Sequence, residues 1–143
     1  EQFDGSVVIV GEGPQKEELV EKAGDNVYFR DFLDRKDLPG FYSGLDAFVT
    51  ASTGDTLGLS PLEANACGTP VVAADNPPFD ETIQEDNGER FLLKDLDSMS
   101  KAISTVLNSS YNCRDSVKQY SLSSTIEQME DMYRRLGDRD GDG

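Results

Sequence analysis

The stretch TASTGDTLGLSPLEANACGTPVV, residues 50–72, decides how this chain folds. A short apolar run, residues 46–50 (DAFVT), leads into it, and its end belongs to a second apolar run, residues 69–74 (TPVVAA). Between the two runs, a glycine-containing loop precedes a helical pattern over residues 61–67. A strand, a helix and a second strand in this order predict a parallel sheet, whose ligands bind at the carboxyl ends of the strands.

The same alternation extends to both ends of the chain. It predicts an α/β fold, a Rossmann-like parallel sheet with helices on both faces, within one domain over residues 1–137. We expect the polar tail, residues 138–143, to be disordered. The further strands are expected at residues 6–10, 26–30 and 90–93, and the further helices at residues 14–23, 34–42 and 96–107 and around residues 126–136.

Two acids with seven residues between them, Asp55 and Glu63, stand out in the opening stretch. Each has a purely structural interpretation. Ser60 and Glu63 fit a capping box with Pro61 at the first helical position, so that Glu63 reaches back to the cap amide. Asp55 fits a turn acid that bonds its own backbone.

Taken together, the two acids also fit a ligand site. The helix that follows Gly58 begins with free backbone amides and the positive end of its dipole, which suits a phosphate. Asp55 lies just before this helix start and Glu63 lies one turn inside it. Carboxylates accept hydrogen bonds from hydroxyls, so this layout suits a nucleotide sugar: a ribose, two phosphates and a sugar.

The composition is strongly acidic. The net charge is −15, with 17 Asp and 11 Glu against 6 Lys and 7 Arg spread along the chain. Such a surface repels nucleic acid and anionic lipid at ordinary salt. An ordinary acidic protein is one explanation, and a host that works in molar salt, such as a halophilic archaeon, is the other. Abundant Asp with scarce Lys favours the second.

The cysteine and histidine content excludes several classes of site. There are two cysteines, Cys67 and Cys113, and no histidine. This is no disulfide framework, no zinc site is indicated, and Ser-His-Asp or Cys-His catalysis within the chain is excluded. No metal or cofactor is predicted, and a reducing cytoplasm is the simplest setting.

Two further motifs are incomplete. GEGP, residues 11–14, follows a predicted strand, but Lys16 stands where a dinucleotide fingerprint needs its third glycine. The two glycines instead allow a sharp turn beside a ligand crevice. DRDGDG, residues 138–143, matches the first six positions of a calcium loop, but the later ligands do not follow, so a solvated acidic tail is expected.

The run from Asp55 to Ala73 resembles a motif of the C-terminal, donor-binding domain of GT-B glycosyltransferases of family 4, a large retaining group. That motif has an acid, seven residues and a Glu, in a run such as E-G-F-G-L-x-x-L-E-A-M-A-x-G-T-P-V-V-A. The segments VVIVGEGPQKEEL, VYFRDFLDRKDLPGFYSGLDAFV and SVKQYSLSSTIEQMEDMYRRL are similar to other parts of the same domain, so the resemblance extends from Val7 to Leu136.

The resemblance implies a role for each candidate residue. Asp55 and Glu63 are the candidate catalytic residues, with Glu63 on the ribose hydroxyls and Asp55 beside the donor sugar. The substrate is a UDP- or GDP-sugar, and no side chain attacks the sugar. The candidate donor-binding residues are Thr56, Leu57, Gly58 and Leu59 for the diphosphate and sugar, Phe32 and Leu33 for the base, and Gly11 and Gly13 for the crevice wall.

The chain departs from the family pattern at three points. Asp55 is one methylene shorter than the usual Glu, and Thr56-Leu57 replaces Gly-Phe. The family's first strand-helix unit, with a basic pair that grips the diphosphate, has no counterpart before Glu1, and neither has the acceptor domain. We expect a part of a longer enzyme that is inactive alone and that associates with a membrane peripherally through the missing domain. A truncated relative is the alternative.

The sequence therefore indicates the donor-binding half of an enzyme that transfers a hexosyl group to a lipid, glycan or small-molecule acceptor. A GT-B nucleotide-sugar epimerase is one alternative, although such enzymes rely on further acids and on histidines. The other is a non-catalytic α/β binding module, in which Asp55 and Glu63 are only a turn acid and a helix cap.

The acidity predicts a dependence on salt. Thermal stability and donor binding should both increase from low to molar KCl, because a Debye length of about 3 Å at 1 M removes the repulsion within the chain and between the chain and a diphosphate. Thermal unfolding followed across a KCl series measures the first effect. A melting temperature that stays flat across the series contradicts the halophilic interpretation.

Overall fold

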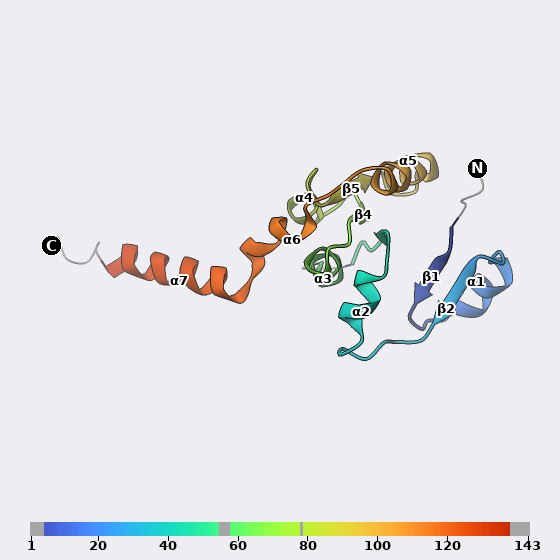
Figure 1. Ribbon diagram of the computed structural model, residues 1–143, viewed down its shortest axis with the longest axis horizontal. Coiled ribbons are helices and arrows are strands. Elements are labelled where there is room, and N and C mark those ends of the chain that lie inside the picture. The colour runs from blue at the N-terminus through green and yellow to red at the C-terminus, as the bar shows by residue number, and fades with distance from the viewer. Residues whose placement is uncertain (1–4, 55–57, 78, 138–143) are drawn as a thin grey trace. The chain divides into compact units, whose positions relative to one another are not determined.

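The computed structural model describes residues 5–54, 58–77 and 79–137, the last six of them by their backbone alone. It separates into two compact units, Glu1–Leu38 and Pro39–Gly143, which are described one at a time (Figure 1). The predicted disordered tail, residues 138–143, lies outside the described residues, together with its partial likeness to a calcium loop.

The first unit is a pair of parallel strands. β1 (Val7–Val10) pairs with β2 (Val27–Arg30), and α1 (Lys16–Lys22) connects them in sequence. β-branched residues favour extended backbone, which explains why the run at β1 forms a strand. Both predicted strands are confirmed. The helix begins later than predicted, because residues 14–15 form a turn before it.

The second unit contains a three-stranded parallel sheet in the order β3-β4-β5. β3 (Phe48–Thr50) pairs with β4 (Val71–Ala74), which pairs with β5 (Gly88–Phe91). All four residues of β4 have no exposed surface, as expected for a central strand covered on both faces. The predicted α/β class, with parallel sheets and helices on both faces, is confirmed.

Two helices cover the opposite faces of this sheet. Val72 and Ala74 pack with Phe91 and with residues of α5 (Leu96–Leu107) in one buried cluster. Because successive side chains of a strand point to opposite faces, the alternate residues of β4 face α3 (Leu59–Cys67). The predicted apolar face of α5 is confirmed at its centre only: Met99, Ile103 and Val106 pack inward, whereas Leu96 is 80% exposed.

Four shorter elements surround this core, and a long helix follows them. β5 begins two residues before the predicted strand, because the loop before it turns at Asn87 and delivers Gly88 directly against β4. α4 (Phe79–Thr82), α6 (Cys113–Ser116) and the 3-10 helix η1 (Lys118–Tyr120) were not predicted, since three or four residues carry no readable periodicity. The fourth short element is α2 (Leu38–Ser43), and the long helix is α7 (Leu122–Gly137).

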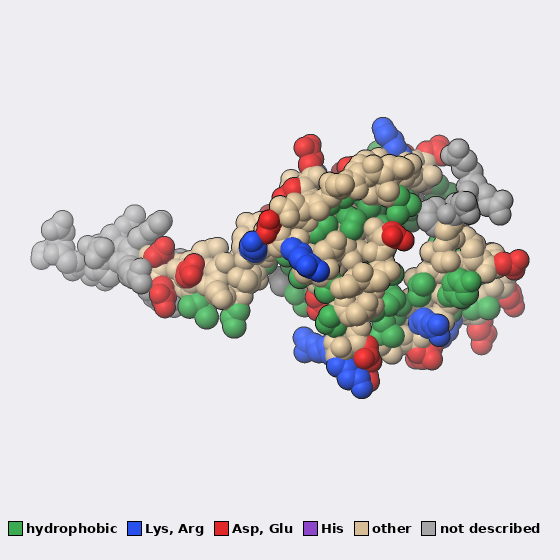
Figure 2. Space-filling view, in the orientation of Figure 1, with side chains coloured by type: hydrophobic (Ala, Val, Ile, Leu, Met, Phe, Trp, Pro, Cys, Tyr) green, Lys and Arg blue, Asp and Glu red, His purple; other side chains and the backbone are tan. Residues whose placement is uncertain are grey.

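The surface carries the acidic character of the sequence. On the face shown in Figure 2, Asp and Glu side chains (red) lie over several helices and loops and do not gather in one patch. Within the described ranges, no helix is both long enough and apolar enough to cross a membrane.

A buried amide network joins α3 to the start of β5. Asn65 stands where the family motif has methionine, and its Nδ2 donates to the carbonyls of Thr69 and Asn87, both at 3.0 Å. The Asn87 side chain in turn donates to the Thr82 carbonyl at 2.9 Å and to Ser116 Oγ at 3.0 Å. Buried amides need such partners, so this network fixes the position of α3 over the sheet.

β5 approaches β4 so closely at Gly88 that there is no room for a side chain. A Cβ at this position would lie 2.1 Å from the backbone carbonyl oxygen of Val71, which cannot move without breaking the sheet. Gly88→Ala should therefore lower the free energy of unfolding by about 1–3 kcal/mol or more, which is the usual cost of overpacking. Gly40→Ala is the control, because nothing lies within 4 Å of its added Cβ. Equal melting temperatures for the two variants contradict the described pairing of β4 and β5.

Candidate functional site

The start of α3 is set by Gly58. Gly58 is the N-cap and has a left-handed backbone with φ of 60°, and its carbonyl accepts from the amide of Leu62 at 3.3 Å. The helix begins at Leu59, and no side chain caps it. The capping-box interpretation is therefore wrong. With the cap at Gly58, Ser60 is already the second helical residue and Glu63 the fifth, too far along to reach the cap.

This helix start offers backbone amides to a ligand. The first amides of a helix have no partner within it, and here they include those of Leu59 and Ser60, both exposed residues. Pro61, the third residue, has no N–H to offer. An anion at this end of α3 therefore meets amides from its first two residues, together with the positive end of the helix dipole.

Glu63 lies half-buried one turn beyond these amides. The hydroxyl of Tyr42 donates a hydrogen bond to Glu63 Oε2 at 3.3 Å. Tyr42 is 5% exposed, and its ring packs edge-on against Phe48 of β3 with the ring centres 5.7 Å apart. Tyr42 was not a predicted site residue, because no pattern along the chain pairs two residues that are 21 positions apart.

Burial raises the pKa of the Tyr42 hydroxyl above its ordinary value of 10.0. A hydrogen bond with Ser60 acts in the opposite direction, and the negative charge of Glu63 adds to the increase. Tyr42 is therefore protonated at neutral pH and acts as the hydrogen-bond donor to the Glu63 carboxylate.

Four other predicted residues lie in the first unit. Gly11 and Gly13 follow β1, and Phe32 and Leu33 follow β2, so all four lie at the carboxyl ends of paired parallel strands. The Gly11 amide donates to the carbonyl of Arg30 at 3.0 Å, which ties the two strand ends together. The Phe32 side chain is 77% exposed and Leu33 is half-buried.

A cation lies at the same edge of the first unit. Lys16 Nζ is 2.6 Å from Asp31 Oδ1, at the start of α1 and directly after β2. The hydrogen bond to Asp31 raises the pKa of Lys16, and the same bond lowers the pKa of Asp31. Both groups are charged at neutral pH, so this edge carries a solvent-exposed ion pair, and its Asp31 precedes the exposed Phe32 in sequence.

The structure thus divides the predicted residues into two sets. Gly58, Leu59 and Glu63 lie on the first turns of α3 in the second unit. Gly11, Gly13, Phe32 and Leu33 share one edge of the first unit. The predicted acid Asp55 and its neighbours Thr56 and Leu57 lie outside the described residues.

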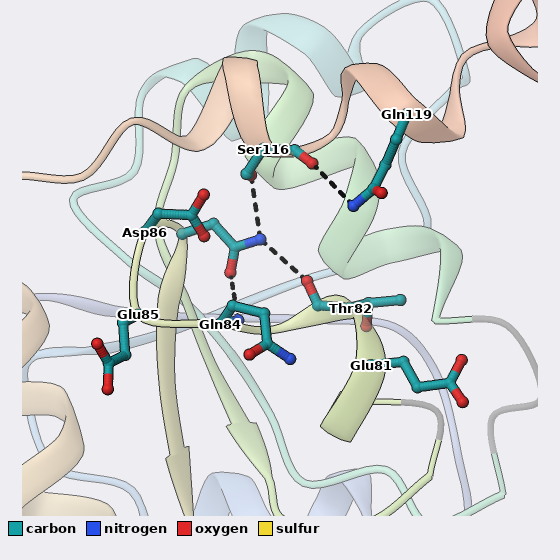
Figure 3. Close-up of a pocket in the computed structure, with 8 residues that line it drawn as sticks. Glu81, Thr82, Gln84, Glu85, Asp86, Ser116 and Gln119 are labelled. Atoms are coloured by element: carbon teal, nitrogen blue, oxygen red, sulfur yellow. Dashed lines mark hydrogen bonds between the residues drawn. The ribbon is translucent and has the colours of Figure 1, made fainter.

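A hollow of about 430 Å³ lies elsewhere in the second unit (Figure 3). It is lined by residues of α4, of the loop before β5, of α6 and of η1, so it opens at the amino ends of the strands. Ligands of doubly wound sheets bind at the carboxyl ends, and none of the predicted site residues lines this hollow. Its carboxylates are exposed, and its buried Asn87 is bonded to Thr82 and Ser116.

Comparison with known proteins places the chain among glycosyl transferases. The family described as "Glycosyl transferases group 1" matches residues 1–109. The alpha-monoglucosyldiacylglycerol synthase of Streptococcus pneumoniae is 36% identical over 84 residues, which is 55% of this chain and 19% of that protein. A GDP-mannose-dependent alpha-(1-6)-phosphatidylinositol dimannoside mannosyltransferase of Mycobacterium tuberculosis is 37% identical over 87 residues, which is 59% and 23%.

The solved structures support the same placement. Sucrose-phosphate synthase from Thermosynechococcus elongatus superposes with a TM-score of 0.74 at 26% identity, over 94% of this chain and 39% of that chain. The structural neighbours are GT-B glycosyltransferases. The chain spans only about a fifth of the length of the two curated relatives.

The left-handed cap predicts which residues Gly58 can be exchanged for. Gly58→Ala should lower the free energy of unfolding by about 1–2 kcal/mol, because a Cβ disfavours this backbone. Gly58→Asn should cost less, because asparagine adopts the left-handed region more readily. Urea unfolding of the two variants measures the difference. If alanine is tolerated as well as asparagine, α3 does not begin at a left-handed Gly58.

Proposed function

Because this chain belongs to the group 1 glycosyl transferases, we propose that it is the C-terminal, donor-binding domain of a retaining GT-B enzyme of family 4. The observation that carries the proposal is the start of α3. Amides of two exposed residues, Leu59 and Ser60, precede a half-buried carboxylate, Glu63, by one helical turn. This arrangement offers amides to a diphosphate and a carboxylate to hydroxyls, which are the two chemistries of a nucleotide sugar.

The donor is a UDP- or GDP-sugar. Glu63 accepts hydrogen bonds from the ribose hydroxyls. The amides of Leu59 and Ser60 at the start of α3, together with those of Leu57 and Gly58 just before it, hold the diphosphate. Asp55 stands beside the donor sugar. The name of the mycobacterial relative, which is GDP-mannose-dependent, supports a nucleoside-diphosphate sugar as the substrate.

In the first unit, two residues are proposed to contact the base and two glycines to form the wall of the crevice. The exposed ring of Phe32 and the neighbouring Leu33 lie where a parallel sheet receives ligands, and they contact the base. Gly11 and Gly13 let the backbone approach the nucleotide, because they carry no side chain.

The chemical work of this domain is electrostatic. The sugar is transferred with retention, on one face of the ring, and the leaving diphosphate helps to deprotonate the acceptor. No side chain of this chain attacks the sugar. Amides fixed at a helix start stabilise negative charge as it develops on the leaving group, without reorganising during the reaction. The amide end of α3 supplies this stabilisation, with Glu63 fixing the nucleotide in register.

The acceptor is a lipid, a glycan or a small molecule, and it binds to an N-terminal domain of the same enzyme. The names of the two relatives, a glucosyldiacylglycerol synthase and a phosphatidylinositol dimannoside mannosyltransferase, support a lipid. We place the enzyme in the cytoplasm of a halophilic organism, associated with the membrane through that N-terminal domain. The acidic surface supports the halophilic setting.

Glu63→Ala tests the donor site directly. In calorimetric titrations of the full-length protein with UDP- and GDP-sugars at high salt, we expect the wild type to bind one of the two classes. The variant should bind that class about tenfold more weakly or worse, because it loses hydrogen bonds from ribose hydroxyls to a charged acceptor. The isolated chain is expected to be inactive as a transferase.

Glu89→Ala is the matched control. Glu89 also accepts a hydrogen bond from a tyrosine, Tyr111, at 3.3 Å, but it lies on β5 on the face covered by α5. Its removal should leave donor affinity unchanged. If the wild type binds neither class of donor, the chain is a non-catalytic module. If the two variants lose donor affinity equally, the nucleotide site lies away from α3.

A further inference from the structure

We propose that Tyr42 is a positioning residue that aims the carboxylate of Glu63 at the ribose of the donor. The inference rests on the proposed function, because it concerns the same site. It goes beyond that function by assigning the discrimination between ribose and deoxyribose donors to the contact of a buried tyrosine on α2 with the carboxylate.

Tyr42 bonds only one of the two carboxylate oxygens of Glu63 in the described contacts. Tyr42 Oη donates to Glu63 Oε2 at 3.3 Å, and a carboxylate has a second oxygen that can accept from a ligand. The distance is longer than the 2.7–2.8 Å usual for hydroxyl donors. The tyrosine therefore restricts where the carboxylate points without saturating it, which leaves acceptor capacity for ribose hydroxyls.

Tyr42 is itself held from both ends. Its ring is 5% exposed and packs against Phe48 at 5.7 Å and beside Phe41 at 5.8 Å. Its backbone carbonyl accepts from Thr69 Oγ1 at 2.5 Å. A side chain fixed at ring and backbone presents its hydroxyl in one place, so it can act as a reference point for a longer and more flexible glutamate.

A series of hydrogen bonds connects Tyr42 back to a second residue of α3. Thr69, which bonds the backbone of Tyr42, also accepts through its own carbonyl from Asn65 Nδ2 at 3.0 Å. Asn65 and Glu63 are both on α3, two residues apart. The contacts Glu63–Tyr42, Tyr42–Thr69 and Thr69–Asn65 therefore connect two residues of α3 through a buried residue of α2, which couples the position of Glu63 to that of Tyr42.

The chemistry of the tyrosine suits this role. Burial, together with the nearby negative charge of Glu63, raises the pKa of the Tyr42 hydroxyl above 10.0, so it is a hydrogen-bond donor at neutral pH. Because a hydroxyl carries no charge, it orients the carboxylate without neutralising it. The other oxygen of Glu63, and the remaining lone pair of Oε2, can still accept from the two vicinal hydroxyls of a ribose.

Tyr42→Phe removes only the hydroxyl and keeps the ring packing. The readout is the ratio of affinities of the full-length protein for the donor it binds and for the 2′-deoxy and 3′-deoxy forms of that donor, by calorimetry. A site built to bond a hydroxyl rejects an analogue that lacks it, so the wild type should prefer the ribose donor. Tyr42→Phe should reduce this preference about tenfold, mostly by weakening ribose-donor binding.

Tyr111→Phe is the matched control. It deletes an equivalent tyrosine–glutamate hydrogen bond, also of 3.3 Å, on the other face of the sheet. Its removal should leave the ribose preference unchanged. Titrations are run at a temperature at which circular dichroism shows every variant to be folded, so a general loss of stability does not enter the comparison.

A double variant completes the test. If Tyr42 acts through Glu63, then Tyr42→Phe combined with Glu63→Ala should bind the donor no more weakly than Glu63→Ala alone. Losses that multiply in the double variant overturn the inference, and so does a Tyr42→Phe variant that keeps the wild-type ribose preference. In both of those cases the proposed function stands, provided that Glu63→Ala alone loses the preference. If Glu63→Ala also keeps it, the proposed function fails as well.

Discussion

The left-handed backbone of Gly58 is the constraint on which the rest of the second unit depends. It starts α3 at Leu59. Within this helix Ala64 and Asn65 are fully buried, whereas Glu63 is half-exposed. A helix that began two residues later would change which backbone amides are free at its end.

The position of α3 is then fixed from three directions. β4 is fully buried beneath it. The Asn65 amide donates to the backbone carbonyl of Thr69, just before β4, and to that of Asn87, just before β5. Tyr42 of α2 donates a hydrogen bond to Glu63. Buried polar groups are stabilising only when their bonds are made, so these contacts specify one arrangement more than they add to stability. A ligand site at the helix start benefits from that rigidity, because its amides and carboxylate are oriented before the ligand arrives.

Most of the architecture could be predicted because its signals are local. Runs of β-branched and aromatic residues predict strands at residues 6–10 and 26–30, which the structure has at 7–10 and 27–30, and the apolar period predicts the helix at residues 96–107. The start of β5 was misplaced, because the reason for Gly88 is the carbonyl of Val71, 17 residues away. The capping box was wrong for a related reason: Ser60 and Glu63 have the right spacing, but spacing cannot report the φ of Gly58.

The sequence by itself determined the order of the elements, the parallel α/β class and the pair of acids with seven residues between them, because periodicity and spacing are properties of neighbouring residues. Only the tertiary structure decided where α3 begins, that Glu63 accepts a bond from Tyr42, and that Asn65 is a buried bridge to Asn87. The last two features depend on contacts between residues about 20 positions apart, which exist only once the sheet and its helices have packed together. The start of α3 depends on the left-handed backbone of Gly58, which the spacing of residues does not report.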